Sequence, residues 1–455
     1  MNYAIGAEQR RQIEKTRLHR MIARLARTPT AAESDRLALI IKTVAPEAQS
    51  QFIGMHAVPL MRDNLASLDI GGLASLKADG LHAHAAFVNS DAKQSADTVL
   101  FVTRSETSAL PHCFAIDRVF MHTRTAVLFD GELCLRKRVL SADECRAINS
   151  GQNVHTRPYL EYPAACDAQA HADGVDVTSD SYQAVYDSHF ELVYAAFDCM
   201  YLQRKSQAMR PFAERIALVH KLTESLPIAD NTRRYRERVA QIQAAVDYAG
   251  GTERFALRIF MKPMFAVQHA RAAMHAVPAC MQGIATDGVI FYSATDTYIV
   301  GNNPRLLKWK PEHTADLVVA RLVDTTGGTA DTSSIVPRQP FGLFAVAPHG
   351  LVLVSRNVLA DTPAARALLQ QIDVESNAGK TLILECVGVL IKTAFNAPDA
   401  PPAVYWRPVQ MRVEKLAPNS LDIYMSIVNA IVVHLDEAAV VAYITATASS
   451  QQTPA

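Results

Sequence analysis

Short runs of β-branched and aromatic residues, separated by glycine, proline or polar breaks, recur along most of the chain and predict antiparallel strands. Between about Leu68 and Phe129 these runs are VLFVT, CFAIDRVFM and TAVLFDGEL. Later runs are ELVYAAFDCMYL, FALRIFMKPMF, DGVIFYS and TYIVG. Beyond Pro311 a further set of short runs, from DLVVARLV to VYWRPVQMRVEK, is compatible with a small β-barrel.

Helical periodicity is confined to a few segments, so we expect an α+β protein with helices flanking antiparallel sheets. Residues 8–27 have the spacing of a basic amphipathic helix, interpreted first as a surface helix and second as a contact for RNA or a partner. Thr30 and Glu33 form a capping-box pattern that predicts a helix near residues 31–44. Residues 155–188 are irregular and acidic and are interpreted as a surface insertion. Other helices are expected near Ser141, in two parts of residues 210–250, and over residues 421–447.

The chain has 455 residues, which suits two domains of unequal size. Its 45 basic residues equal its 45 acidic ones, which argues against a protein that coats nucleic acid but leaves room for a local basic cleft. Its seven cysteines are widely spaced without a CxxC pair, which argues against a zinc ribbon or a secreted disulfide framework. A charged N-terminus and the lack of a long apolar stretch predict a soluble protein that is not secreted and has no membrane span.

Two short patterns suggest a P-loop and a zinc site, but both are incomplete. The tripeptide GKT at Gly379 lacks the earlier glycine of a phosphate-binding P-loop, because Val374 stands there, and it leads into a strand-like segment where a P-loop opens a helix. His82 and His84 share a strand face, but no cysteine or acid beside them in the sequence completes a zinc site.

Six other short segments occur in an order that no single structural role explains. They are KADG (77–80), FDGE (129–132), AFD (196–198), TDGVIF (286–291), LKWKP (307–311) and WRPVQMRVEKLAPN (406–419). Taken singly, KADG is a common surface turn, FDGE is a hairpin signal and LKWKP is a solvated strand with one buried tryptophan. Their joint occurrence predicts a functional site.

The residue types in these segments suit phosphate chemistry. Lys77 precedes a glycine turn at a strand end and is a candidate nucleophile, provided that cationic neighbours or burial lower its pKa. Lys308 and Lys310 point to one face of a strand, where they repel each other unless an anion lies between them. Glu132 and Asp287 add carboxylates, which beside phosphate indicate a divalent metal. Together these groups predict nucleotidyl transfer through a covalent lysine adduct.

With these motifs the chain resembles the mRNA capping enzyme guanylyltransferases, from about Leu68 to Ala430. These enzymes belong to the covalent nucleotidyltransferase superfamily, which also holds ATP-dependent DNA and RNA ligases. The resemblance implies that Lys77 becomes guanylylated and that Asp287 and Glu132 bind Mg²⁺ or Mn²⁺. It implies a set of residues that bind the substrate GTP: Asp79, Gly80, His82, Arg118, Glu132, Phe197, Lys262, Lys308, Lys310, Arg412 and Lys415.

The family assigns roles within this set. Phe197 is implied to stack on guanine, Lys262 to read the guanine carbonyl, and the two lysines of LKWKP to hold the α-phosphate. Arg118 resembles a family arginine near the ribose. Arg412 and Lys415 are implied to orient the β- and γ-phosphates when a C-terminal OB-fold closes on the nucleotide.

Three positions depart from the family pattern. Gln410 and Glu414 replace an arginine and an aspartate of the last motif, and His82 stands where an arginine usually follows KADG. His82 can donate a similar hydrogen bond but is charged only when protonated. The tryptophan and the PN pair of the last motif, together with LKWKP, favour capping enzymes over ligases.

The resemblance implies a nucleotidyltransferase domain of antiparallel sheets with flanking helices, followed by an OB-fold. The expected divisions are a helical extension (1–67), the nucleotidyltransferase domain (68–311), the OB-fold with a C-terminal helix (312–448) and a disordered tail (449–455). Expected partners are 5′-diphosphate RNA ends, a separate RNA triphosphatase and cap methyltransferase, and RNA polymerase as a further possibility. The expected location is the nucleus or a viral replication site in the cytoplasm.

Two alternatives stay open at this point. One is an ATP-dependent polynucleotide ligase, which shares the covalent chemistry. The other is a catalytically silent relative that binds RNA ends or RNA polymerase, an interpretation that rests on His82 and Gln410.

Overall fold

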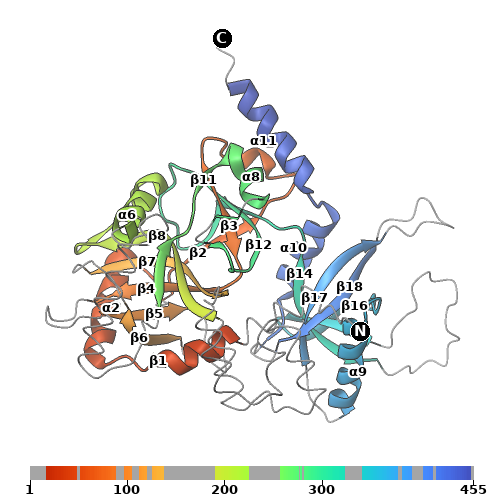
Figure 1. Ribbon diagram of the computed structural model, residues 1–455. Coiled ribbons are helices and arrows are strands. Elements are labelled where there is room, and N and C mark those ends of the chain that lie inside the picture. Colours follow the sequence, from red (N-terminus) through yellow and green to blue (C-terminus); the bar gives the residue numbers. More distant parts are fainter. Residues whose placement is uncertain are drawn as a thin grey trace, which may run out of the picture.

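The strands that the structure describes form three sheets. The computed structural model describes residues 17–48, 52–88, 97–104, 112–119, 126–137, 190–224, 257–275, 277–278, 281–322, 341–377, 382–391, 403–412 and 417–451. Figure 1 shows the first two sheets in one body, with the third sheet beside it. Several predicted features lie outside the described residues: the helix near Ser141, the insertion 155–188, the second helix of 210–250, and Lys415.

The first sheet has eight strands in the order β1-β6-β5-β4-β7-β8-β10, with β9 paired to β8. Every ladder is antiparallel except that between β8 and β10. The continuous apolar runs of β7 and β8 are buried along almost their whole length, because helices and the second sheet cover this sheet. The strand bounds are β1 Ala26–Arg27, β4 Leu81–Phe87, β5 Asp97–Thr103, β6 Cys113–Val119, β7 Val127–Lys137, β8 Phe190–Leu202, β9 Lys205–Ser206 and β10 Arg258–Met261.

The second sheet has five strands in the order β11-β3-β12-β13-β2. Its bounds are β2 Met55–Pro59, β3 Leu73–Ala78, β11 Phe265–Ala266, β12 Thr286–Tyr292 and β13 Gly301–Trp309. Strand β2 comes from the segment expected to be a helical extension, residues 1–67, and it pairs in parallel with β13. Residues 1–67 therefore contribute strands to both sheets, since buried apolar residues such as Phe52 and Ile53 anchor this segment in the core.

The third sheet is antiparallel, with the order β16-β15-β14-β17-β18. Helix α9 (Pro363–Asn377) lies between β16 and β17 in the chain. The OB-fold barrel is not confirmed: among the described residues, one bridge between Val358 and Trp406 joins the two edges, without a closing ladder. The strand bounds are β14 Thr314–Arg321, β15 Phe341–Ala347, β16 Gly350–Ser355, β17 Leu382–Ile391 and β18 Ala403–Met411.

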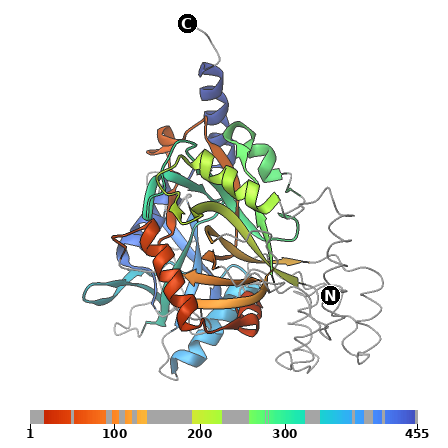
Figure 2. The same ribbon diagram turned by 90° about the vertical axis from the view of Figure 1, so that its left-hand side faces the viewer.

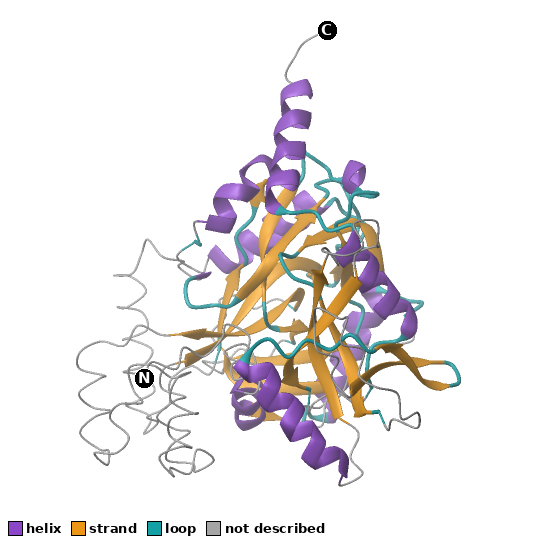
Figure 3. Cartoon of the chain, turned by 90° about the vertical axis from the view of Figure 1, so that its right-hand side faces the viewer, coloured by secondary structure: helices purple, strands orange, loops and turns teal. Residues whose placement is uncertain are grey.

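Helices lie around the outside of the strands (Figure 3). Helices α2 (Ala31–Val44) and α6 (Phe212–Glu224) cover the first sheet and both contact β8 (Figure 2). Helix α8 (Ala270–His275) and the 3-10 turns η1 (Leu65–Ser67) and η3 (Val267–His269) border the second sheet. The capping box predicted for α2 is confirmed, because Thr30 Oγ1 accepts from the Glu33 N–H and Glu33 Oε2 accepts from the Thr30 N–H.

The helix expected over residues 421–447 is two helices, α10 (Leu421–Val432) and α11 (Glu437–Gln451), with a 76° bend between them. Asp436 makes the break, because its carboxylate accepts from the Ala439 N–H at 2.7 Å and starts α11 afresh. Among the described residues, no single helix has the length and apolar character to cross a membrane, although this bent pair passes that test jointly.

The buried apolar residues that the structure describes form three hydrophobic clusters, and α10 and α11 belong to different ones. Tyr424 and Ile431 of α10 are buried with the third sheet, whereas Val440 and Ile444 of α11 are buried with the second. The indole of Trp309 donates to the carbonyl of Leu435 at 2.8 Å. The chain therefore returns from the third sheet to the body that holds the first two.

We expect Thr30→Ala to lower the free energy of unfolding by about 1 kcal/mol, since it removes the cap of α2. Thr43→Ala, in the same helix, is the matched control. The Thr43 hydroxyl is exposed and donates only to the Leu39 carbonyl, so its loss should change stability by less than about 0.5 kcal/mol. Urea unfolding of both variants measures the difference, and equal effects would contradict the capping role.

Candidate functional site

Lys77, Asp287 and Lys310 meet where three neighbouring strands of the second sheet end. Lys77 Nζ lies 2.8 Å from Asp287 Oδ1, and Lys310 Nζ lies 2.6 Å from Asp287 Oδ2. The strands can approach here because Gly288, at φ 149°, has no side chain: a Cβ would lie 2.1 Å from the Trp309 carbonyl oxygen. The Lys77 side chain is 18% exposed, so a ligand can reach it.

Three lysines and a carboxylate influence one another at this point. Burial would raise the pKa of Asp287, but the ammonium groups of Lys77 and Lys310 lower it by more, so the carboxylate stays ionised. Burial and the neighbouring Lys310 and Lys77 lower the pKa of Lys308 to about 8. Lys77 and Lys310 thus share one carboxylate beside a third lysine, an arrangement that suits the oxygens of a phosphate.

The turn between β3 and β4 holds the lysine in place. The N–H of Asp79 donates to the carbonyl of Ala285 at 2.8 Å, which ties the turn to the chain just before β12. A Cβ on Gly80 would lie 2.5 Å from the Leu133 carbonyl oxygen, so only glycine fits between β4 and β7. The KADG segment therefore has a structural need for its glycine.

Lys262, Glu132 and Phe197 form a second group, on the first sheet. Lys262 follows β10 and is fully buried; its ammonium lies 3.7 Å from Glu132 Oε2 and 5.2 Å from the centre of the Phe197 ring. Neither Lys262 Nζ nor Glu132 Oε2 has a hydrogen-bond partner among the described residues. Burial lowers the pKa of Lys262 despite the attraction of Glu132. Such unsatisfied buried groups are costly, which indicates that a polar ligand completes them.

Phe197 sits in a β-bulge. In the β7–β8 ladder Asp130 pairs with Asp198 and Gly131 pairs with Ala196, so Phe197 is the extra residue on β8. A bulge re-aims the side chain of its extra residue, and here it brings the ring beside Lys262.

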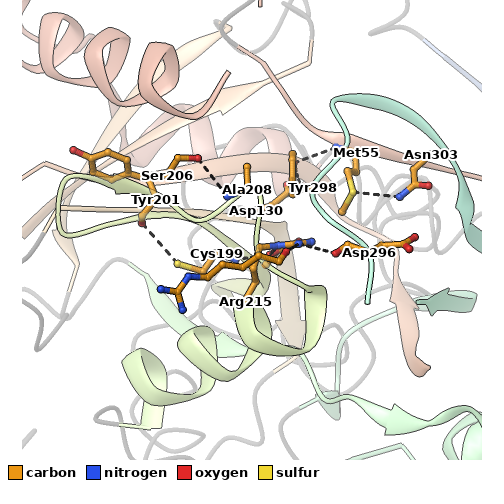
Figure 4. A network of polar contacts seen from close by, with 12 residues as sticks. Met55, Asp130, Cys199, Tyr201, Ser206, Ala208, Arg215, Asp296, Tyr298 and Asn303 are labelled. Atoms are coloured by element: carbon orange, nitrogen blue, oxygen red, sulfur yellow. Dashed lines mark hydrogen bonds and ion pairs between the residues drawn. The ribbon is translucent and has the colours of Figure 1, made fainter. Parts of the chain in front are cut away.

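A buried ion pair supports this bulge from behind. Arg215 of α6 donates through Nε and Nη2 to the two carboxylate oxygens of Asp198, at 2.8 and 2.9 Å. Its Nη1 donates to the carbonyl of Asp296 at 2.9 Å, and its guanidinium lies over the Tyr298 ring. Figure 4 shows Arg215 beneath the strand, with Met55 and Tyr298 beside Asp130. Both members of the pair are fully buried, so they hold β8 to α6.

Asp130 orients two histidines of β4. Its Oδ1 lies 2.7 Å from Nε2 of His82 and 3.2 Å from Nδ1 of His84, while Tyr298 donates to Oδ2 at 2.6 Å. The Ile53 N–H donates to Nε2 of His84, which places the proton of that neutral ring on Nδ1, facing Asp130. Burial would lower the pKa of His82, but the charge of Asp130 raises it, which favours the protonated ring.

The structure brings together most of the predicted site residues. Lys77, Asp287, Lys308 and Lys310 come from the second sheet, and Glu132, Phe197, Lys262 and His82 come from the first. The two groups are close enough to interact, because Glu132 raises the pKa of Lys77 and Lys77 lowers that of Lys262.

Arg118 is not brought to this group. Its neighbour Val119 pairs with Asp97, at the start of β5, and Phe87 pairs with Val99, so Arg118 lies at the opposite end of the first sheet from His82. The end of β5 is at the site, where Thr103 pairs with Ala83. Arg104, which follows Thr103 and is exposed, is therefore an arginine at this end of the sheet that none of the motifs marked.

Arg412 is held within the third sheet. Its Nη1 donates to Asp316 Oδ1 at 2.7 Å and to Glu385 Oε2 at 3.1 Å, on strands β14 and β17. The described arrangement therefore pairs Arg412 with carboxylates of its own sheet, whereas the sequence predicted its convergence with the lysines. Lys415, predicted to act with it, lies outside the described residues.

The carboxylates fit a divalent metal held partly by a ligand. Among the described residues no group of three or more histidines, cysteines, aspartates or glutamates is placed to bind a metal alone. Mg²⁺ commonly takes one or two carboxylates together with phosphate oxygens and water. Glu132 has a buried oxygen without a hydrogen-bond partner, and Asp287 is nearby in the lysine group, so these two acids suit such a site.

Comparisons with known proteins add little. No known protein family and no curated protein matches the sequence. Similar solved structures include a mycobacterial DNA ligase D complexed with ATP and MES (14% identity, 81% of this chain and 97% of that chain, TM-score 0.35). Another is the ATP-dependent DNA ligase from bacteriophage T7 in complex with ATP (14% identity, 78% and 97%, TM-score 0.25). TM-scores this low assign neither fold nor function.

We expect the Asp198–Arg215 ion pair beneath Phe197 to stabilise the folded protein. Arg215→Met leaves Asp198 buried and uncompensated, and should cost about 3–5 kcal/mol of unfolding free energy. Adding Asp198→Asn should recover part of this loss, because the unpaired charge is gone.

Urea unfolding of the two single variants and the double variant measures the coupling. Arg210→Ala is the matched control, since its exposed pair with Glu214 should contribute less than about 0.5 kcal/mol. Losses that simply add in the double variant would contradict the supporting role.

Proposed function

We propose that the protein is an mRNA guanylyltransferase, which moves GMP from GTP through a covalent adduct on Lys77 to a 5′-diphosphate RNA end. The observation that carries the proposal is the juxtaposition of two groups. One is Lys77 with Lys310 on the shared carboxylate of Asp287, and the other is the buried Lys262 beside Phe197. The first suits an α-phosphate and the second suits a purine.

The reaction has two steps with Lys77 at the centre. In the first, Lys77 Nζ attacks the α-phosphorus of GTP; a P–N bond forms, the P–O bond to pyrophosphate breaks, and the lysine loses its proton. In the second, a terminal oxygen of the RNA diphosphate attacks the same phosphorus, the P–N bond breaks, and the lysine regains a proton. Lys308 and Lys310 stabilise the charge that develops on the phosphoryl oxygens.

Lys77 must be deprotonated before it attacks. Burial would lower its pKa, but attraction to Asp287 and Glu132 keeps it raised in the arrangement described. When those acids hold a divalent cation, the same burial and the repulsion from Lys310 favour the neutral amine. Bound Mg²⁺ or Mn²⁺ would also neutralise charge on the phosphates.

The choice of GTP rests on Lys262. An ammonium group only donates hydrogen bonds, so it matches the carbonyl of guanine and not the amino group that adenine carries at that position. Phe197 offers its ring face for stacking. With adenine, the buried Lys262 ammonium would face an amino group and would keep a donor without an acceptor. The cost of that unsatisfied donor favours GTP over ATP.

The third sheet supports a role in closing the site. Its strand order, with α9 between the third and fourth strands, is compatible with an OB-fold. The proposal assigns Arg412 and Lys415 to the β- and γ-phosphates when this unit closes. Asp316 and Glu385 would then release Arg412. Separate proteins would supply the triphosphatase and methyltransferase steps, in a nucleus or a viral replication site.

Incubation with labelled GTP and Mg²⁺ should give a protein adduct that survives denaturing gels. Lys77→Ala should abolish it and a metal chelator should prevent it, because nucleophile and charge neutralisation are both required. Lys205→Ala, which removes an exposed lysine of β9, is the matched control and should label normally. An adduct on Lys77→Ala would overturn the nucleophile, an adduct from ATP alone would point to a ligase, and none from either nucleotide would point to a silent relative.

Lys262→Met should lower the rate of adduct formation from GTP by about tenfold or more, since it removes a buried hydrogen-bond donor. The rate from ATP should stay the same or rise. Met keeps the aliphatic stem but leaves the buried Glu132 carboxylate without its nearest cation, so the rates are compared at a temperature at which circular dichroism shows the variant to be folded. Equal losses with both nucleotides would contradict the role in base selection.

A further inference from the structure

A row of aromatic rings leads away from the proposed guanine site. The His82 ring centre lies 5.7 Å from that of Phe197, and His56 of β2 lies 6.0 Å beyond His82. Phe52 supports the outer part of the row, packing edge-on against His82 at 5.0 Å and stacking with His56 at 6.0 Å. Gly54 permits this packing, because a Cβ there would lie 2.6 Å from the Phe52 ring and 2.9 Å from His82.

The outer end of the row is cationic. Arg104 lies within electrostatic range of both His56 and Lys308, and its charge helps to lower the pKa of each. Burial is the main reason that the pKa of His56 falls to about 4, so this half-buried ring is neutral at physiological pH. The chain therefore places an uncharged ring within electrostatic range of an exposed guanidinium and of Lys308.

A neutral ring beside cations is the chemistry that holds single-stranded nucleic acid, because bases stack on the ring while cations follow the phosphates. The nucleotide that donates GMP already has its own partners: Phe197 and Lys262 at the base end and Lys77 and Lys310 at the phosphate end. Arg104 follows β5, which lies on the other side of β4 from β7 and β8, so it is on the side of His82 away from Phe197. His56 lies within electrostatic range of Arg104.

We propose that His56 and Arg104, with Phe52 behind them, form the site for the first nucleotide of the acceptor RNA. Its base stacks on His56 and its phosphate binds Arg104. This inference rests on the proposed guanylyltransferase activity and deepens it, since it names residues that serve only the second step. Both parts come from places that the motifs did not mark, the N-terminal segment and the loop after β5.

Measuring the two half-reactions separately distinguishes the proposed RNA site from the GTP site. The full-length protein is first labelled with GTP, and the adduct is then chased with 5′-diphosphate RNA under single-turnover conditions. His56→Ala and Arg104→Ala should form the adduct at rates within about twofold of the parent, but transfer GMP to RNA about tenfold more slowly or worse at subsaturating RNA. His56→Phe should restore transfer, because the ring and not the imidazole nitrogens makes the contact.

Arg204→Ala is the matched control for Arg104→Ala. It removes one exposed arginine from the β8–β9 turn, at the far end of the same sheet, where Leu202 pairs with Val127. Binding of the RNA without GTP gives an independent measure. Loss of one phosphate contact should reduce the slope of log K against log salt by about 0.7 in Arg104→Ala and leave it unchanged in Arg204→Ala.

Parallel loss of adduct formation in the two alanine variants would overturn the inference, because the residues would then belong to the GTP site. Failure of His56→Phe to restore transfer, or an unchanged salt slope in Arg104→Ala, would also overturn it. A parent protein that forms no adduct would instead refute the proposed function, and the binding measurement would still decide whether His56 and Arg104 hold RNA.

Discussion

The shared carboxylate of Asp287 is the interaction on which the site depends. It allows Lys77 and Lys310 to approach from neighbouring strands, where two ammonium groups alone would repel each other. Lys308 belongs to the same group, and Glu132 and Asp79 add negative charge around Lys77. Within a chain of zero net charge, these charged groups are concentrated where β3 and β13 end and β12 begins, which is the proposed phosphate site.

The base end of the site depends on buried polar contacts in the first sheet. Asp130 binds His82 and Tyr298 by hydrogen bonds and thereby sets the orientation of His82. The Asp198–Arg215 pair holds the bulge that aims Phe197. Buried polar groups whose hydrogen bonds are made rigidify their surroundings, whereas a buried group without a hydrogen-bond partner can bind a ligand. Lys262 is such a group among the described residues, so the proposed specificity for guanine rests on it.

The sequence predicted a structural feature correctly where that feature depends only on neighbouring residues. The capping box of Thr30 and Glu33 starts α2 as predicted, because it needs only residues three apart. The helix predicted over residues 421–447 was wrong in its continuity. The apolar composition of this segment does not indicate where the chain turns. In the structure, Asp436 starts a second helix, and this part of the chain packs with Trp309 in another hydrophobic cluster.

Motifs and spacing were enough to mark the groups that could carry the chemistry: Lys77 before a glycine, paired lysines on one strand face and carboxylates at strand ends. Which other residues meet these groups depends on how the strands pair in three dimensions. Arg118 and Arg104 are both at strand ends and look equivalent in the sequence, yet β5 and β6 run in opposite directions, so one ends at the site and the other ends away from it. Strand direction and pairing are long-range properties, and the spacing of residues along a chain does not contain them.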